Sequence, residues 1–331
     1  MTTLYLTDPR AFVTKRGETL VVRVDGASAT TLPLARISQV VCCGDVSWSG
    51  AALRELLEDG IAVAYIGPRG EWVGRWEPGE SKAVPLRRAQ YRAADDPERC
   101  RVIAARMVWG KVRNQRALLQ RALREGMLAA APEVAALGAL AERLDGVRDV
   151  DEARGIEGAA ASAYFPAYGR LVSRHGFSFA TRQRRPAPDP INAMLSFGYT
   201  LLRTSMAVAV RTVGFDAHVG FLHTDRYGRE SLALDLMEEF RVPVVDALVA
   251  ALVNKRVLTP GSFELDATSC RLVAEARKTF IRQYEGKLES ELVHPVLGHK
   301  VTYRRSLELQ ARILAKHLSG ELPGYVPFTR R

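Results

Sequence analysis

The first 80 residues carry short apolar segments separated by glycine, proline and charged turns, a pattern typical of β-strands. Two segments, 11–14 and 19–24, flank a short turn that contains Gly17, and we expect them to form a hairpin. The amphipathic stretch 49–57 predicts a helix that ends in a left-handed cap at Gly60. The other strands are expected at 4–6, 37–41, 61–66 and 72–76.

The pattern changes near residue 80. Residues 77–81 read EPGES, a linker signal, and from Leu86 onward leucine, alanine, arginine and glutamate recur at helical spacing. The predicted helices cover about 86–126, 130–145, 150–168, 190–213, 230–254, 268–285 and 303–319. The sequence therefore predicts an α+β protein, with a small β-rich N-terminal domain (1–80) and a larger all-α C-terminal domain (81–331).

Composition and charge narrow the class of protein. The chain has 331 residues, and 47% of them are hydrophobic, which is typical of a globular protein rather than a disordered one. Its 47 basic and 37 acidic residues give a net charge of +10. That excess is compatible with a polyanionic partner such as DNA or RNA, and equally with ordinary solubility charge.

The cysteines and the apolar runs indicate the cellular compartment in which the protein is expected. Cys42, Cys43, Cys100 and Cys270 make no C-x-x-C pair, so we expect free thiols in a reducing compartment and a cytoplasmic protein. The first residues do not resemble a signal peptide. No run approaches 18 apolar residues, and we expect no membrane span.

A helix that is apolar on one side is expected at 231–240, and Asp235, Glu238 and Glu239 interrupt that apolar side. Its apolar positions recur at intervals of four: Leu232, Leu236 and Phe240. Asp235 lies three residues before Glu238 and four before Glu239, so these carboxylates are expected to project toward one side. Carboxylates crowded beside an apolar stripe repel one another, and a metal ion or an arginine cluster relieves that repulsion.

His223 ends the apolar loop just ahead of this helix. One histidine and two carboxylates make a mixed nitrogen and oxygen set, which suits Mg²⁺ or Mn²⁺ in phosphodiester chemistry better than structural zinc. A cation held there could polarise a phosphate oxygen and activate an attacking hydroxyl. A structural ion-pair site is the alternative.

Glu157 is a second acidic candidate, flanked by Gly155 and Gly158. Each glycine costs about 1 kcal/mol inside a helix, and close approach of another helix is one compensating reason. Such packing would press Glu157 into an interface where an ionised carboxylate needs a cation. An exposed glutamate on a helix of small residues is the alternative.

Two basic segments suit a phosphate-rich partner. Residues 86–126 hold eleven arginines or lysines and four acids, and residues 170–185 hold five arginines and no acid. Arg182, Arg184 and Arg185 precede a proline-rich loop, and such a guanidinium cluster can clamp phosphate. A solvated helix face or surface loop explains each segment equally well.

Other chemistries find little support. The chain has no G-x-G-x-x-G and no Walker loop, which argues against nucleotide cofactors. It also has no H-E-x-x-H and no G-x-S-x-G, which argues against protease and esterase functions.

Four stretches, in this order, resemble the CRISPR-associated (Cas) integrase and endonuclease family of spacer acquisition. They are Gly155–Ala160, Asp189–Tyr199, Gly220–His223 and Leu232–Arg241. Each is weak alone, but the combination is specific, and the resemblance covers nearly the whole chain. It implies that Glu157, His223 and Glu238 coordinate a divalent metal. Asp235 stays open as an outer or alternate ligand.

The resemblance implies a function and an assembly. The expected enzyme joins the 3′-hydroxyl ends of short duplex DNA to a repeat array by metal-assisted transesterification, with nuclease activity from the same site. The family also implies a homodimer formed through the N-terminal domains and bridging by a small ferredoxin-like Cas partner. The alternative is a non-catalytic DNA-binding scaffold with a structural acidic site.

Overall fold

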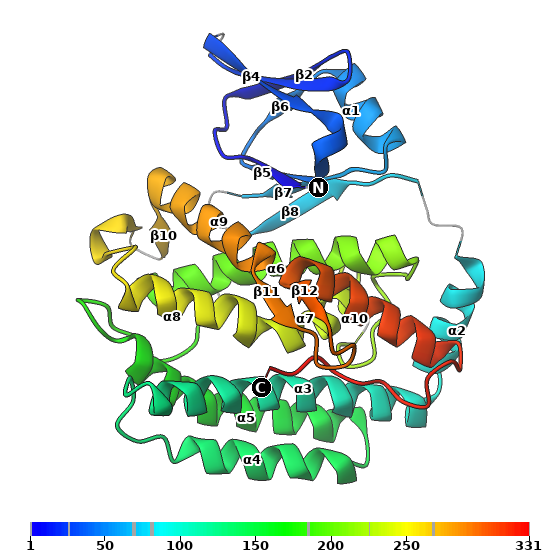
Figure 1. Ribbon diagram of the computed structural model, residues 1–331, viewed down its shortest axis with the longest axis vertical. Helices are drawn as coiled ribbons and strands as arrows, with labels where there is room; N and C mark the ends of the chain where they lie inside the picture. The colour runs from blue at the N-terminus through cyan, green and yellow to red at the C-terminus, as the bar shows by residue number, and fades with distance from the viewer. Residues whose placement is uncertain are drawn as a thin grey trace. The chain divides into compact units, whose positions relative to one another are not determined.

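The computed structural model describes residues 2–25, 27–67, 71–79, 83–183, 186–224, 226–266 and 269–330. The chain divides into two compact units, Met1–Glu80 and Ser81–Arg331 (Figure 1). The first unit is rich in strands and the second is mostly helical, which confirms the α+β fold class. All four cysteines lie among the described residues and are free thiols.

Two four-stranded sheets build the N-terminal unit. In the first, β1 (Thr2–Leu6), β5 (Ile37–Cys43) and β7 (Ala62–Ile66) run parallel, and β8 (Trp72–Trp76) pairs antiparallel with β7. The order of the second sheet is β4 (Ala27–Pro33), β3 (Thr19–Val24), β2 (Ala11–Arg16) and β6 (Ser47–Trp48). β2 and β3 form the predicted hairpin.

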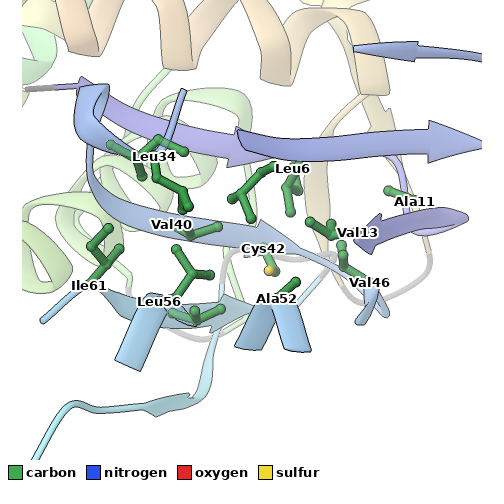
Figure 2. Close-up of a cluster of buried hydrophobic side chains, with 13 residues drawn as sticks. Leu6, Ala11, Val13, Leu34, Val40, Cys42, Val46, Ala52, Leu56 and Ile61 are labelled. Atoms are coloured by element: carbon green, nitrogen blue, oxygen red, sulfur yellow. The ribbon is translucent and has the colours of Figure 1, made fainter. Parts of the chain in front are cut away.

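A cluster of buried apolar side chains forms the core of this unit (Figure 2). α1 (Gly50–Glu58) contributes Ala52, and β5 contributes Val40. α1 begins at Ser49, whose hydroxyl accepts a hydrogen bond from the backbone of Ala52. After α1 the backbone reaches φ +76° at Gly60, so the predicted left-handed cap is confirmed.

β4 and β6 were not predicted. β4 reads ASATTLP, and its small and hydroxyl side chains lack the apolar alternation that signals a strand. β6 is only two residues long, too short to give any periodic signal.

Long helices build the C-terminal unit (Figure 1). They are α2 (Val84–Ala94), α3 (Pro97–Arg124), α4 (Glu133–Arg143), α5 (Val150–Val172), α6 (Pro190–Val213), α7 (Ser231–Phe240), α8 (Ala247–Asn254), α9 (Ala274–Glu289) and α10 (Tyr303–Leu318). α3, α4 and α5 pack against one another, and α7 packs against both α3 and α6. The helix with three carboxylates therefore lies inside the unit.

The predicted helix 86–126 is two helices. Asp96 caps α3, because its carboxylate accepts hydrogen bonds from the backbone N–H groups of Glu98 at 3.0 Å and Arg99 at 3.2 Å. Pro97 follows in the first turn, where its missing N–H is harmless.

The predicted helix 230–254 is also interrupted. α7 passes into a π-helical segment, Arg241–Asp246, and then into α8. Pro243 lies in that segment and removes one backbone donor, which accounts for the shift in hydrogen bonding. Such π-helical insertions are frequent at functional sites.

The C-terminal unit is mostly helical rather than all-α, so that detail of the prediction was wrong. β9 (Phe263–Leu265) pairs with β10 (Cys270–Leu272), and β11 (Glu291–Val293) pairs with β12 (Lys300–Thr302). The predicted helix 268–285 therefore begins with β10. These strands have three residues each, too few for a period to show in the sequence.

α6 is the one described helix that is long and apolar enough to cross a membrane by length and composition alone. Its most apolar window is 67% buried inside the unit, and core helices pass the same test. The observation is therefore weak support for a membrane span.

Candidate active site

The three carboxylates of α7 are all buried, but they face different surroundings. Asp235 faces the loop that ends at His223, Glu238 faces two basic side chains, and Glu239 faces the C-terminal segment. The expectation that all three carboxylates project toward one side of the helix was therefore wrong for Glu239, because α7 is enclosed on more than one side.

Asp235 fixes the loop before α7. Its Oδ2 atom accepts hydrogen bonds from the backbone N–H groups of Phe221 at 2.6 Å and Leu222 at 2.9 Å. Its Oδ1 atom accepts from the backbone N–H of His223 at 3.0 Å and from His223 Nδ1 at 2.6 Å. Both oxygens are thus occupied by the loop. Asp235 was expected to be either an outer or an alternate ligand. These contacts favour the outer role, in which Asp235 positions His223 and does not itself contact a cation.

Gly220 allows this close approach. A Cβ atom at Gly220 would lie 2.7 Å from Asp235 Oδ2 and 2.8 Å from Ser231 Cβ, distances that real Cβ atoms do not adopt. The glycine that opens the G-F-L-H stretch is therefore required by packing against α7.

Glu239 anchors the C-terminal segment. It accepts hydrogen bonds from Tyr325 Oη at 2.5 Å and from the backbone N–H of Phe328 at 2.6 Å. Asn114 of α3 donates hydrogen bonds to the backbone oxygens of Glu239 and Phe328. Burial raises the pKa of Glu239 to about 8, although these hydrogen bonds oppose the shift. Its function is structural support for α7.

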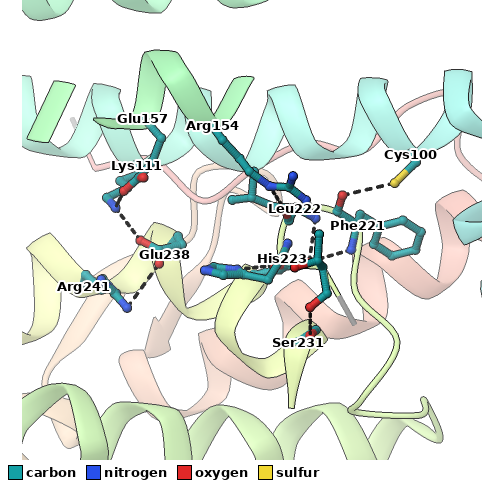
Figure 3. A network of polar contacts seen from close by, with 12 residues as sticks. Cys100, Lys111, Arg154, Glu157, Phe221, Leu222, His223, Ser231, Glu238 and Arg241 are labelled. Carbon is teal, nitrogen blue, oxygen red and sulfur yellow. Dashed lines mark hydrogen bonds and ion pairs between the residues drawn. The ribbon is translucent and has the colours of Figure 1, made fainter. Parts of the chain in front are cut away.

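Glu238 faces two cations. Lys111 Nζ lies 2.7 Å from Glu238 Oε2, and Arg241 Nη2 lies 3.2 Å from Oε1 (Figure 3). Burial alone would raise the pKa of Glu238, but the charges of Arg241 and Lys111 lower it to about 2. Both carboxylate oxygens of Glu238 therefore have a cationic partner, and the two partners hold Glu238 in its ionised form.

Glu157 reaches the same place from α5. Its carboxylate forms an ion pair with Lys111 Nζ, so the one ammonium group bridges Glu157 and Glu238 (Figure 3). α5 is fixed locally by Asp149, which caps its first turn, and by Arg154 Nε, which donates to Leu222 O at 2.6 Å. Two segments far apart in sequence are thus held beside one another.

The reason inferred for the glycines around Glu157 was wrong. A Cβ atom at Gly155 or Gly158 would meet nothing within 4 Å, so neither glycine admits a neighbouring helix. Both lie on an exposed strip of α5, and the side chain of Glu157 is 27% exposed. A large ligand can reach Glu157 across this strip.

His223 completes the group. Its ring points toward Glu238 in Figure 3. Because a carboxylate oxygen can only accept, Nδ1 carries the proton that it donates to Asp235. The Nε2 lone pair is left for a cation, as in the carboxylate–histidine arrangement of metal sites.

These donors fit a divalent cation. Two carboxylates and one neutral imidazole are ligands that Mn²⁺ or Mg²⁺ accepts. Within the described residues no three His, Cys, Asp or Glu side chains are close enough to hold an ion as they stand. Lys111 occupies the centre, and its flexible stem would have to move for a cation to enter.

Glu157 is part of the lining of a recess. Lys111, Arg182 and Arg241 line it, together with Tyr199. Both guanidinium groups lie over the Tyr199 ring, at 5.5 Å for Arg182 and 4.7 Å for Arg241. Three cationic side chains therefore line the recess beside Glu157.

Arg182 is held in place by α6. It donates to Asn192 Oδ1 at 2.8 Å and to Ser196 Oγ at 3.1 Å, and Asn192 also binds the backbone of Thr181. The structure thus brings Arg182 to the site. Arg184 and Arg185, predicted beside it as a clamp, lie outside the described residues.

Lys111, Arg241 and Asp246 were not predicted as site residues. Asp246 accepts hydrogen bonds from Tyr199 at 2.6 Å and Tyr164 at 2.9 Å, and burial raises its pKa to about 6. Lys111 was visible only as one of eleven basic residues in 86–126. Its burial, at 7% side-chain exposure, sets it apart, and that depends on the fold.

Comparison with known proteins supplies a family. The sequence model described as "CRISPR associated protein Cas1" matches residues 4–286. A CRISPR-associated endonuclease Cas1 from Thermus thermophilus is 38% identical over 99% of this chain and 97% of its own length. A Cas4 exonuclease/Cas1 endonuclease fusion from Geobacter sulfurreducens is also 38% identical over 99% of this chain, which spans 60% of that longer protein.

Solved structures share the fold. A CAS1 protein from Thermotoga maritima is 25% identical, with a TM-score of 0.85 over 97% of both chains. A casposase bound to an integration product has a TM-score of 0.87 at 24% identity, covering 97% of this chain and 92% of that one. At that identity the casposase shows a common fold.

Proposed function

The chain belongs to the Cas1 family of CRISPR-associated proteins, and from that premise we propose that it is a divalent-metal-dependent DNA endonuclease and integrase of CRISPR adaptation. The observation that carries the proposal is that Glu157 and Glu238 meet around a position that a cation already fills, the ammonium of Lys111, with the ring of His223 pointing toward Glu238. The two glutamates come from α5 and α7, and His223 comes from the loop before α7.

The proposed reaction is a transesterification. The 3′-hydroxyl oxygen of a short duplex DNA attacks a phosphorus atom of the repeat array, and the bond from that phosphorus to the array's 3′ oxygen breaks. One phosphodiester bond forms and one is broken, so no external energy source is needed. Water in place of the hydroxyl gives endonuclease activity. A bound Mg²⁺ or Mn²⁺ would polarise the phosphate and stabilise the charge that develops on it.

The chain's own residues would divide the remaining work. Glu157, Glu238 and His223 Nε2 would hold the cation, and Asp235 would keep the proton of His223 on Nδ1. Arg241 would stay paired with Glu238. Lys111, once its ammonium leaves the two carboxylates, would pair with a phosphate oxygen.

DNA binding is proposed for the electropositive side of the site. Arg182 places a fixed positive charge in the recess beside Glu157, and the exposed glycine strip of α5 gives a DNA backbone room to approach. Arg184 and Arg185 are proposed to extend this contact.

The assembly is proposed from the family. We propose a cytoplasmic homodimer that forms through the N-terminal units and is bridged by a small ferredoxin-like Cas partner. In support, β8 lies at an edge of its sheet and exposes Val73 and Trp76, at 67% and 39%. An exposed apolar edge strand is a ready surface for pairing.

A non-catalytic DNA-binding scaffold is the second candidate. The observation that favours it is that Lys111 and Arg241 already neutralise Glu157 and Glu238 without a metal. A strand-transfer assay with labelled duplex and supercoiled repeat DNA separates the two functions. The enzyme requires Mn²⁺ or Mg²⁺ and forms no product with His223→Ala, although that variant still binds DNA. A scaffold yields no product with either protein.

A further inference from the structure

Lys111 has to move if a divalent cation enters the site. Its ammonium forms ion pairs with Glu157 and with Glu238 Oε2, the second at 2.7 Å. The side chain of Lys111 is only 7% exposed, so water has little access to it. A buried charge that loses its partner is strongly destabilising. A displaced ammonium therefore needs another acceptor close by.

Gln115 offers such an acceptor. It lies four residues after Lys111 on α3, and residues at this spacing are neighbours on one face of a helix. Gln115 is 1% exposed, and its Oε1 atom has no hydrogen-bond partner within the described parts of the chain. Both side chains line the recess that also includes Glu157. A buried acceptor without a donor is costly, so an ammonium that reaches Oε1 satisfies both groups.

The recess has room and suitable charge for an ammonium group. Its free volume is about 40 Å³. A water molecule, which is close to an ammonium group in size, takes about 30 Å³. The lining holds two carboxylates, Glu157 and Asp246, beside the two guanidinium groups of Arg182 and Arg241. Without the lysine these charges balance, so the recess can accept one more positive charge.

We propose that Lys111 is a switch with two positions, and that Gln115 is the positioning residue that receives its ammonium when a divalent cation binds. In the first position the ammonium pairs with Glu157 and Glu238. In the second it donates a hydrogen bond to Gln115 Oε1 and keeps two N–H donors, one of which can face a phosphate. The affinity of the site for metal is then set by the cost of moving the lysine. The inference rests on the proposed function, which supplies the divalent cation.

Titration calorimetry of the full-length protein with Mn²⁺, in the absence of DNA, measures that cost. The buffer is at about pH 8, where the carboxylate of Asp246 is ionised. Lys111→Met removes the ammonium and keeps the apolar stem, Gln115→Leu removes the acceptor, and a double variant combines both changes. Lys287→Met is the matched control, because Lys287 is a partly buried lysine of the same unit that lies over the ring of Tyr303.

Lys111→Met should bind Mn²⁺ about tenfold more tightly than the native protein, or better, because a competing charge at the two carboxylates is gone. Gln115→Leu should bind about tenfold more weakly, since it loses a hydrogen bond to a charged group that forms only when metal is bound. The double variant should bind like Lys111→Met, because Gln115 acts through the lysine. The control should bind like the native protein. Damage to the fold would weaken binding, so the gain in Lys111→Met separates the switch from a structural role.

Gln115→Glu tests the same switch with Lys111 in place. A carboxylate in the recess should draw the ammonium away from Glu157 and Glu238 and strengthen Mn²⁺ binding, whereas Gln115→Leu weakens it. Opposite effects at one position do not depend on a folded Lys111→Met protein. Changes of affinity in the same direction would contradict the proposal.

Two further results would overturn the switch and leave the metal site intact. One is a Lys111→Met protein whose Mn²⁺ affinity equals the native value or falls below it, because the lysine then does not compete. The other is an equal loss from Gln115→Leu with and without Lys111, because Gln115 then does not receive the ammonium. If neither the native protein nor Lys111→Met binds Mn²⁺, the proposed function fails as well.

Discussion

Replacing Asp235 with asparagine tests how the site prepares its histidine. Asp235→Asn preserves the shape of a side chain that is fully buried and accepts four hydrogen bonds, two on each oxygen. The amide offers one oxygen and one NH₂ group. With the oxygen kept toward Phe221 and Leu222, the NH₂ group faces the backbone N–H and the ring Nδ1 of His223.

In this arrangement the NH₂ group of the asparagine faces two N–H donors of His223, and the imidazole ring can avoid the clash in one way. Nδ1 can accept a hydrogen bond from the amide if the ring proton moves to Nε2, and Nε2 then has no lone pair for a cation. The backbone N–H of His223 stays unpaired, which costs about 1–3 kcal/mol, and the two remaining bonds lose their charge assistance. We expect the free energy of unfolding to fall by about 2–4 kcal/mol in total. Affinity for Mn²⁺ should fall about 10–100-fold.

Three measurements check this prediction. Denaturant unfolding gives the change in stability, titration calorimetry gives the Mn²⁺ affinity, and ¹⁵N NMR of the histidine ring reports which nitrogen carries the proton. Glu239→Gln is the matched control, because Glu239 is buried on the same helix but faces the C-terminal segment. The control should keep native Mn²⁺ affinity. An Asp235→Asn protein that keeps the proton on Nδ1 and binds Mn²⁺ like the native protein would refute the reasoning.

Three further outcomes are expected. Gly220→Ala should cost about 1–3 kcal/mol and weaken Mn²⁺ binding, because its Cβ would lie 2.7 Å from Asp235 Oδ2; unchanged unfolding curves would contradict this. Burial raises the pKa of Glu239 to about 8, so its stabilising contribution is full below its unfolded pKa of about 4.3 and disappears as pH rises through 8. Glu239→Gln should therefore flatten the fall in Tm between these pH values, and an equal fall in both proteins would be the contrary result. Changing Arg182, Arg184 and Arg185 together to glutamine should reduce the salt dependence of duplex binding by about 0.9 in log–log slope for each phosphate that these arginines neutralise, whereas a native slope would exclude them as a clamp.

Much of the fold could be predicted from local pattern. The hairpin, the cap at Gly60 and the long helices follow from periodicity and turn residues, which act over a few positions. The break at Asp96–Pro97 carried a readable cap signal that the continuous Leu/Ala/Arg pattern obscured. β4 and the three-residue strands could not be predicted, because β4 lacks the apolar alternation of a strand and the others are too short for a period to show.

The site was predicted in part. The pattern of α7 pointed to charged groups inside the protein, and the resemblance singled out Glu157, His223 and Glu238. Lys111 could not be found, because its place between two carboxylates depends on α3, α5 and α7 meeting in space. Composition shows that a lysine is present, but only packing shows that it is buried.

The glycines beside Glu157 show that the same feature of a sequence can have two different structural causes. Gly155 and Gly158 indicated that α5 is unusual, and helix packing was the inferred cause. The structure instead leaves open space above both. A glycine in a sequence marks either close contact or an exposed surface, and the fold is needed to tell them apart.

The most direct test of the central claim is anomalous diffraction from crystals grown with Mn²⁺ and a short duplex DNA. The account predicts one strong manganese peak bound by Glu157, Glu238 and His223 Nε2, with the ammonium of Lys111 displaced and Asp235 still hydrogen-bonded to Nδ1. Manganese at saturating concentration that leaves Lys111 between the two glutamates, or that binds elsewhere, would contradict the account.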